Sequence, residues 1–301
     1  MASSVKQNCK TVAKRWANAL MELTSEDNSI SKDAVLKDLR DIVETINSSQ
    51  ELLNVINNDM NYTLLRNVDN IYIPFRYFVD NNFKETINKI CDKYDTYIYL
   101  PAITKSNYVT FFKKDLDNFN IKGIVISNLS QLELASKYIP NKKLVANYTL
   151  TIFNNHTINL LEKHNFDVFT ISPELNESEI QNLNSEIDKE VIVYGRSLLM
   201  TSEYCVIGKN GACNQKCINN QYMLKDRKNF LFPIYTDRTN CNSLIYNSKI
   251  TSIQANNLNV DSIRIDILDE DIEQINEIIK THLLGNRLEG EEYTNGNLNK
   301  E

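Results

Sequence analysis

Four of the six cysteines lie close together near the middle of the C-terminal half of the chain. Seven residues separate Cys205 from Cys213, three separate Cys213 from Cys217, and 23 separate Cys217 from Cys241. Thiolates suit zinc or an iron–sulfur cluster, and four of them neutralise much of the charge of the metal. Structural zinc sites use two close pairs, whereas only Cys213 and Cys217 form such a pair here. The spacing favours a cluster over a single ion, and zinc stays open as the alternative.

Other features of the chain are consistent with metal ligation by these cysteines. Gly208 and Gly211 are two of only seven glycines, and they stand between the first two cysteines, where a backbone folded tightly around a cofactor needs them. The N-terminus carries no secretory signal and no apolar run is long enough to span a membrane, so we expect a cytoplasmic protein. Disulfides are therefore the weakest interpretation. Cys9 and Cys91 stand apart, and we expect them to be buried or incidental thiols.

A succession of short apolar segments must position this cluster. The chain has 301 residues, 42% of them hydrophobic, which is enough for a sizeable core. Runs that are apolar throughout and alternate with helical patterns are typical of parallel strands. Seven strong runs are Ile71–Phe75, Tyr97–Leu100, Gly123–Ser127, Leu144–Tyr148, Asp167–Ile171, Glu190–Tyr194 and Ser262–Leu268.

A weaker run at Tyr62–Leu65 would bring the number of strands to eight. We predict an α/β fold that is TIM-barrel-like, possibly an incomplete (β/α)8 barrel, and an open doubly wound sheet is the alternative. The cysteines fall in the long gap after the sixth strong run. We expect a barrel-like domain over residues 61–285 with a cysteine insert at 200–250, followed by a polar tail at 286–301.

The chain before residue 60 has a different pattern. Over residues 11–58 the apolar side chains recur at helical spacing, which predicts an N-terminal helical segment over 1–60. The second of its amphipathic helices contains Val35, Leu39, Ile42, Val43 and Ile46.

Charge and strand ends indicate where a ligand would bind. The net charge of −6 argues against a general nucleic-acid coat, but residues 205–228 carry five basic residues against one acid. That segment is either a solvated loop or the rim of an anion site. In a parallel sheet, ligands collect at the carboxyl ends of the strands. The polar or glycine residues there are Arg76, Lys105, Asn128, Asn147, Glu174, Gly195 and Arg196.

Common hydrolase chemistry finds little support. None of the three histidines adjoins the cysteines, and neither a serine nucleophile elbow nor a phosphate-binding glycine loop is present. Four clustered thiols do not suit a cysteine protease, which pairs one thiol with one histidine.

The residues from Ser172 to Arg264 resemble a known family. The matching elements are Ser172–Leu175, Glu190 with Tyr194–Arg196, Tyr204–Cys205, Cys213, Cys217, Leu224–Arg227, Phe232–Pro233, Cys241, Ile245–Ser248 and Arg264. Their order and spacing resemble the collagenase-like peptidases of family U32, over residues 62–296. The resemblance implies a TIM-barrel-like fold with the cysteines near its mouth.

The resemblance also implies a cofactor and a reaction class. Better understood relatives bind a 4Fe–4S cluster through four cysteines and support hydroxylation of RNA or quinone precursors, which implies ligation by Cys205, Cys213, Cys217 and Cys241. We predict Arg196, Arg227 and Glu174 as catalytic candidates, with arginine forks gripping an anion. The predicted substrate-binding residues are Asn147, Tyr194, Asn247 and Arg264. The expected partner is RNA or a small anionic substrate; literal peptidase activity is the alternative.

The N-terminal segment has a separate and weaker resemblance. Ala13–Leu20 and Ser49–Leu53 are similar to the opening of the ATP synthase delta subunit, a helical stator protein. This implies a protein partner docked on the N-terminal helices. The second hypothesis for the whole chain is therefore a non-catalytic assembly protein whose cysteines hold structural zinc.

Overall fold

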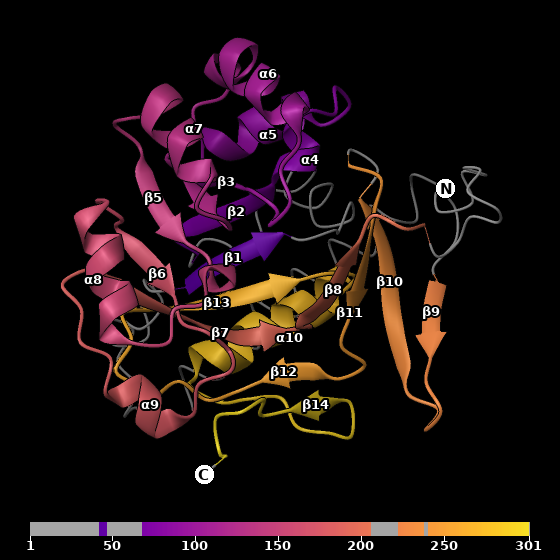
Figure 1. The fold of residues 1–301 in the computed structure, drawn as a ribbon. Helices are drawn as coiled ribbons and strands as arrows, with labels where there is room; N and C mark the ends of the chain where they lie inside the picture. Colours follow the sequence, from indigo (N-terminus) through magenta and orange to yellow (C-terminus); the bar gives the residue numbers. More distant parts are fainter. Residues whose placement is uncertain (1–41, 47–67, 206–221, 238–239, 301) are drawn as a thin grey trace, which may run out of the picture.

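The dominant element is a curled parallel sheet. The computed structural model describes residues 42–46, 68–205, 222–237 and 240–300. The parallel strands are β1 (Ile42–Ile46), β2 (Asn70–Pro74), β3 (Asp95–Tyr99), β4 (Gly123–Ile126), β5 (Lys143–Ala146), β6 (Val168–Thr170), β7 (Asp188–Gly195) and β13 (Ser262–Ile267). They are hydrogen-bonded in that order, and β13 pairs with both β7 and β1, so the sheet curls back on itself (Figure 1).

Helices cover the outer side of this sheet (Figure 1). They are α4 (Phe75–Phe78), α5 (Lys84–Cys91), α6 (Ser106–Lys114), α7 (Gln131–Tyr138), α8 (Asn155–Lys163), α9 (Glu177–Gln181) and α10 (Ile272–Leu283), with short 3-10 turns η3 (Leu116–Asn118) and η4 (Tyr148–Leu150). Local side chains start several of them. The Asn154 side chain accepts from the first turn of α8, and Asn176 and Asp271 form reciprocal capping boxes with Glu179 and Gln274.

The cysteine insert forms a second, smaller sheet. Its antiparallel strands are β8 (Leu198–Ser202), β9 (Tyr222–Lys225), β10 (Leu231–Asp237) and β11 (Asn242–Tyr246), in the order β8-β11-β10-β9. It follows β7 directly, so it stands at the carboxyl end of the parallel strands (Figure 1). The chain then returns through β12 (Ile250–Ser252), which pairs with β7 and with β14 (Tyr293–Thr294).

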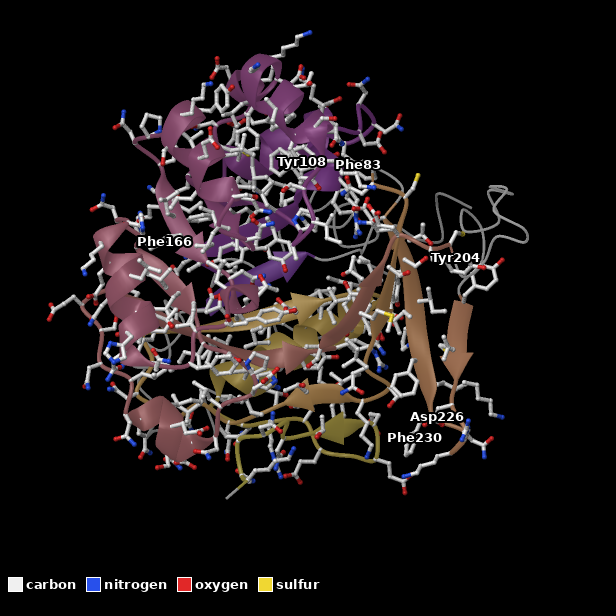
Figure 2. The ribbon with its side chains drawn as sticks, in the orientation of Figure 1. Phe83, Tyr108, Phe166, Tyr204, Asp226 and Phe230 are labelled. Atoms are coloured by element: carbon white, nitrogen blue, oxygen red, sulfur yellow. The ribbon has the colours of Figure 1, made fainter. Side chains whose placement is uncertain are left out.

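Two hydrophobic layers hold these parts together. The larger lies between the strands and the helices and includes Ile73, Phe111 and Ile279, all buried. The smaller contains Tyr72, Tyr97, Val125 and Val145 and lies on the other face of the strands. Because successive residues in a strand point to opposite faces, a strand buried on both faces must be apolar throughout. That requirement explains the continuous apolar runs in the sequence. Figure 2 shows how densely side chains fill the molecule.

All seven strong runs are strands in the structure, within a few residues of the predicted bounds. The α/β class and the barrel-like curl are confirmed, whereas the connection from β1 to β2 lies outside the described residues. The weak candidate Tyr62–Leu65 also lies there, as do residues 1–41. In the part of the chain that the structure describes, no helix is long and apolar enough to cross a membrane.

One predicted helix is wrong where it can be checked. Ile42–Ile46, assigned by its apolar spacing to the N-terminal helical segment, is strand β1 and pairs with β13 and β2. Ile, Val and Thr supply four of its five residues, and these β-branched side chains favour strands. Its apolar spacing fits both periods, so only the position between two other strands decides the outcome.

The predicted polar tail is also part of the fold, because Tyr293–Thr294 forms β14 and Leu298 packs on the core.

Helix α10 buries a histidine, and we expect this to make stability depend on pH. His282 is 5% exposed, its ring centroid lies 6.0 Å from that of Tyr194, and burial lowers its pKa to about 4. Between pH 6.5 and about 4, the unfolded chain therefore binds a proton at this histidine that the folded chain excludes. Above pH 6.5 this histidine does not reduce the free energy of unfolding, and the free energy of unfolding falls as the pH drops through that window. We expect a loss of roughly 3 kcal/mol by pH 4.

Urea unfolding of His282→Leu and wild type at several pH values measures this contribution. The difference in unfolding free energy between the two proteins should shift in favour of the variant as the pH falls. His156→Leu, at an exposed position on α8, is the matched control and should follow wild type. Parallel pH profiles for wild type and His282→Leu would contradict the prediction.

Candidate functional site

A cavity lies where the parallel strands end and the small sheet begins. The strand ends contribute Pro74, Tyr99 and Asp266, and the small sheet contributes Thr201 and Asn242. The remaining lining residues are Phe75, Arg76, Pro101, Ala102, Ile103, Tyr148, Thr149, Arg196, Leu198, Asp237, Leu244 and Tyr246. The carboxyl-end location agrees with the general rule for parallel α/β sheets.

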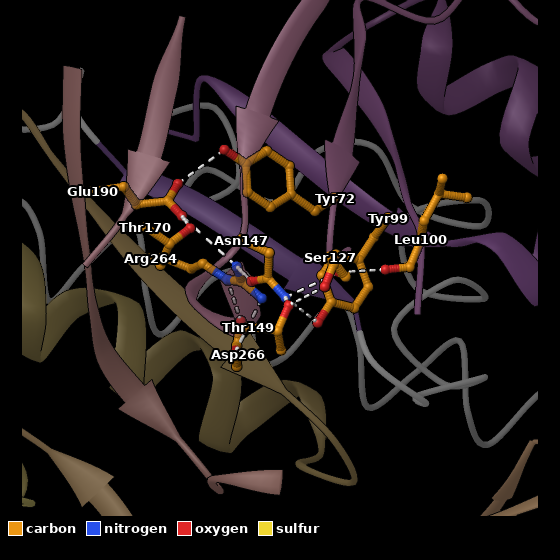
Figure 3. A network of polar contacts seen from close by, with 10 residues as sticks. All are labelled: Tyr72, Tyr99, Leu100, Ser127, Asn147, Thr149, Thr170, Glu190, Arg264 and Asp266. Atoms are coloured by element: carbon orange, nitrogen blue, oxygen red, sulfur yellow. Dashed lines mark hydrogen bonds and ion pairs between the residues drawn. The ribbon is translucent and has the colours of Figure 1, made fainter. Parts of the chain in front are cut away.

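A buried arginine, Arg264, holds Asp266, one of the residues that line this cavity (Figure 3). The Arg264 side chain is fully buried; its Nε donates to Asp266 Oδ1 at 2.6 Å and its Nη2 to Oδ2 at 3.3 Å. Its Nη1 donates to Asn147 Oδ1 at 3.0 Å and lies 3.7 Å from Glu190 Oε1. Burial opposes the charge, but Asp266, Tyr99 and Glu190 together raise the pKa of Arg264. The guanidinium is therefore a permanent cation that fixes the groups around it.

Glu190 is the second carboxylate of this network. Its Oε2 accepts from the Tyr72 hydroxyl at 2.9 Å, and its Oε1 accepts from Thr170 Oγ1 at 2.7 Å. Burial raises the pKa of Glu190, while Arg264 and the two hydroxyl donors act in the opposite direction. A buried carboxylate is tolerated here because each oxygen has a partner.

Asn147 connects the arginine to the strand ends. Its Nδ2 lies 3.1 Å from the Tyr99 hydroxyl, 3.1 Å from Ser127 Oγ and 3.2 Å from Thr149 Oγ1. The side chain is fully buried, so a lost partner would leave a costly unsatisfied polar group. Asn147 thus ties together groups from β3, from η4 and from the residue that follows β4.

Asp266 reaches the cavity because the neighbouring strand ends in a glycine. Gly195 has a φ of 138°, and a Cβ there would lie 2.6 Å from the Asp266 Cβ. The absence of a side chain at the end of β7 therefore leaves room for this carboxylate. Three tyrosines line the same cavity, and burial raises the pKa of Tyr99, Tyr148 and Tyr246, which keeps them neutral phenols.

Arg196 approaches the cavity from the end of β7. Its Nη1 donates to the backbone carbonyls of Asn247 and Ser248, at 2.9 and 2.7 Å. Its Nε is buried and makes no hydrogen bond to the described part of the chain. The carbonyls fix the guanidinium, and the remaining N–H groups are suited to an anion in the cavity.

Two of the four clustered cysteines, Cys205 and Cys241, lie in the described residues. Strand β8 pairs with β11 so that Ser202 stands opposite Ser243, which brings the chain just after β8 and just before β11 to the same end of the ladder. Cys205 and Cys241 occupy those two places, and both are exposed. Cys241 has a left-handed φ of 56° and precedes Asn242, which lines the cavity. Cys213 and Cys217 lie outside the described residues.

A family model described as peptidase family U32 matches residues 78–288. The chain belongs to peptidase family U32. Among solved structures, the U32 peptidase Mk0906 is similar with a TM-score of 0.45 and 11% identity, covering 77% of this chain and 94% of that one. The YdjI aldolase from Escherichia coli K12 is similar with a TM-score of 0.38 and 8% identity, covering 53% and 68%. A search of curated proteins finds no match.

Only some of the predicted residues of this U32 protein come together. Arg264 and Asn147 are in contact. Arg196 lines the cavity, and its guanidinium donates to the backbone carbonyl of Asn247. Asn247, predicted to bind substrate, thus contacts Arg196 through its backbone carbonyl.

Three other predicted residues lie elsewhere. Tyr194 donates to Glu270 at 3.0 Å and packs against His282 of α10, so it does not line the cavity. Glu174 is exposed in the loop after β6. Arg227 is exposed in the turn between β9 and β10. Asp226, labelled at this turn in Figure 2, holds it through an Oδ1 that accepts from the backbone N–H groups of Lys228 and Phe230. Arg227 does not line the cavity.

Several residues of the site were missed from the sequence. Asp266 and Tyr99 were assigned only to strands, and Glu190 was noted only for its strand and the family resemblance, because strand assignment counts apolar residues. A signal did exist: Arg264 and Asp266 stand two residues apart in an otherwise apolar run, so they share one face of a buried strand. Charges on a buried face must find partners.

We expect the Arg264 network to dominate local stability. Arg264→Leu leaves Asp266 and Glu190 buried without their cation, which should destabilise the fold by about 3–5 kcal/mol. Urea unfolding measures the change. Arg287→Leu is the matched control, because Arg287 pairs with the exposed Glu289, and it should cost below about 1 kcal/mol. Equal losses of unfolding free energy in the two variants would contradict the prediction, because the buried network would then contribute no more than an exposed ion pair.

Proposed function

We propose that this U32 family protein holds a 4Fe–4S cluster through Cys205, Cys213, Cys217 and Cys241 at the mouth of its barrel-like sheet. In this proposal the protein supports hydroxylation or other modification of RNA or a small anionic metabolite. The register of β8 against β11 is the observation that carries it, because it places two cysteines from distant parts of the chain at one end of a ladder. The donor set fits the cofactor, since thiolates are the usual ligands of such clusters.

A cluster held beside the cavity would be close enough to act on a substrate bound there. A bound 4Fe–4S cluster would supply one-electron transfer at the edge of the cavity. Arg196, fixed by two carbonyls, would bind an anionic group of the substrate. Asp266, fixed by Arg264, would accept a hydrogen bond from a donor group elsewhere on the substrate. The small sheet covers the strand ends through Leu198, Leu244 and Tyr246, which would limit access of water.

Anaerobic purification tests the cofactor. We expect a brown protein with about four iron and four sulfide ions per chain. Cys205→Ser and Cys241→Ser should each lose most of this iron, because serine is a poor ligand for a soft metal site. Cys91→Ala is the control, since Cys91 is buried in α5 away from the insert, and it should keep the iron.

Two results would point to the other functions. A colourless protein with one tightly bound zinc per chain would contradict the cluster and favour a structural metal. Cleavage of gelatin that survives replacement of all four cysteines would favour literal peptidase activity.

A further inference from the structure

The hydroxyl of Tyr99 is surrounded by groups that can only donate hydrogen bonds. Arginine has no acceptor, so the oxygen of the Asn147 amide must face Arg264 Nη1, at 3.0 Å. The Asn147 NH2 group then faces Tyr99, at 3.1 Å. The Arg264 guanidinium, which also lacks an acceptor, lies over the Tyr99 ring, with its central carbon 5.3 Å from the ring centroid. Neither neighbour can receive the Tyr99 hydrogen.

The other hydroxyls of the network confirm this direction. Ser127 Oγ donates to the Leu100 carbonyl at 2.5 Å, and Thr149 Oγ1 donates to the Ser127 carbonyl at 2.7 Å. Both hydroxyls therefore face the Asn147 NH2 group as acceptors, and neither is hydrogen-bonded to Tyr99, whose hydroxyl contacts only that NH2 group among the described residues. Among the described residues none accepts the Tyr99 O–H, while Tyr99 lines the cavity. Its hydrogen is available to a ligand.

Asp266 presents the opposite property beside it. Its two oxygens are held by Nε and Nη2 of Arg264, and its side chain is 10% exposed where it lines the cavity. An ionised carboxylate has about four acceptor positions, and Arg264 uses one on each oxygen. One guanidinium thus fixes both a neutral donor, Tyr99, and an anionic acceptor, Asp266, on the same wall. Figure 3 shows these residues around Arg264.

We propose that Tyr99 and Asp266 form a subsite for an amide-type group whose carbonyl oxygen and N–H lie on the same edge. The ligand carbonyl accepts from Tyr99, and its N–H donates to Asp266. A ring lactam or imide has such an edge, and so does a primary carboxamide. A trans peptide bond does not, because its C=O and N–H point in opposite directions. The subsite rests on the proposed substrate cavity and refines it by naming the group that is recognised.

Small probes of similar size test the subsite on the full-length chain by ligand-observed NMR titration. The set consists of 2-pyrrolidinone, N-methyl-2-pyrrolidinone, propionamide, N-methylacetamide, propionate and pyrrolidinium. We expect 2-pyrrolidinone to bind about tenfold more tightly than its N-methyl derivative, which lacks the N–H, and than the trans amide N-methylacetamide. Comparison of 2-pyrrolidinone with propionamide distinguishes a ring ligand from an open-chain carboxamide.

Variants assign the binding to the two residues. Tyr99→Phe and Asp266→Asn should each weaken 2-pyrrolidinone binding about tenfold. Tyr97→Phe is the matched control, because Tyr97 is buried on the same strand two residues earlier, faces the same side and does not line the cavity. It should bind like wild type, and circular dichroism should show that all three variants are folded.

The outcomes distinguish failure of the proposed subsite from failure of the proposed cofactor. The lactam preference should persist in Cys241→Ser, so loss of the cluster alone leaves the subsite standing. Unchanged 2-pyrrolidinone binding in folded Tyr99→Phe would overturn the subsite, and so would tighter binding of pyrrolidinium than of the lactam. Either result leaves the iron measurement unaffected.

Discussion

The site depends on one constraint, the burial of a permanent cation inside a closed ring of strands. The guanidinium of Arg264 cannot lose its proton, so every group in reach must be arranged to compensate it. Asp266 takes two of its N–H groups, Asn147 takes a third, and Glu190 lies within ion-pair distance. Contributions from β13, β7 and the end of β5 are thereby locked in one arrangement. The donors and acceptors offered to the cavity follow from this arrangement.

The same constraint explains how a mostly apolar barrel can carry a polar site. Tyr72 has its hydroxyl bonded to Glu190 and its ring packed on Tyr97 and against the Arg264 guanidinium. The phenols thus connect the hydrophobic layer to the charged one. A network in which every member is paired can be rigid, whereas a partly paired one would be costly. Rigidity of this kind is what a binding site needs to hold its groups at fixed positions.

The small sheet adds a second level of organisation. It does not extend the curled parallel sheet; it contributes residues to the cavity at the strand ends, and Cys205 and Cys241 lie at one end of its β8–β11 ladder. The two parts meet at the cavity, with Asp266 from the barrel on one side and Asn242, next to Cys241, on the other. The proposed cluster and the proposed amide subsite would therefore border one space. Membership of family U32 fits this architecture but does not by itself assign a reaction.

The sequence by itself determined the seven buried strands, because a strand covered on both faces must be apolar throughout. It also determined the family, since the resemblance depends on residue types and spacing alone. It could not assign Ile42–Ile46, whose apolar spacing suits helix and strand equally and which becomes a strand by pairing with β13 and β2. Nor could it bring Tyr99, Asn147 and Asp266 together, since they come from three distant segments and are joined by the Asn147–Tyr99 contact and by the Arg264 guanidinium. Direction of hydrogen bonding is a property of such contacts, and contacts between distant strands exist only in the tertiary structure.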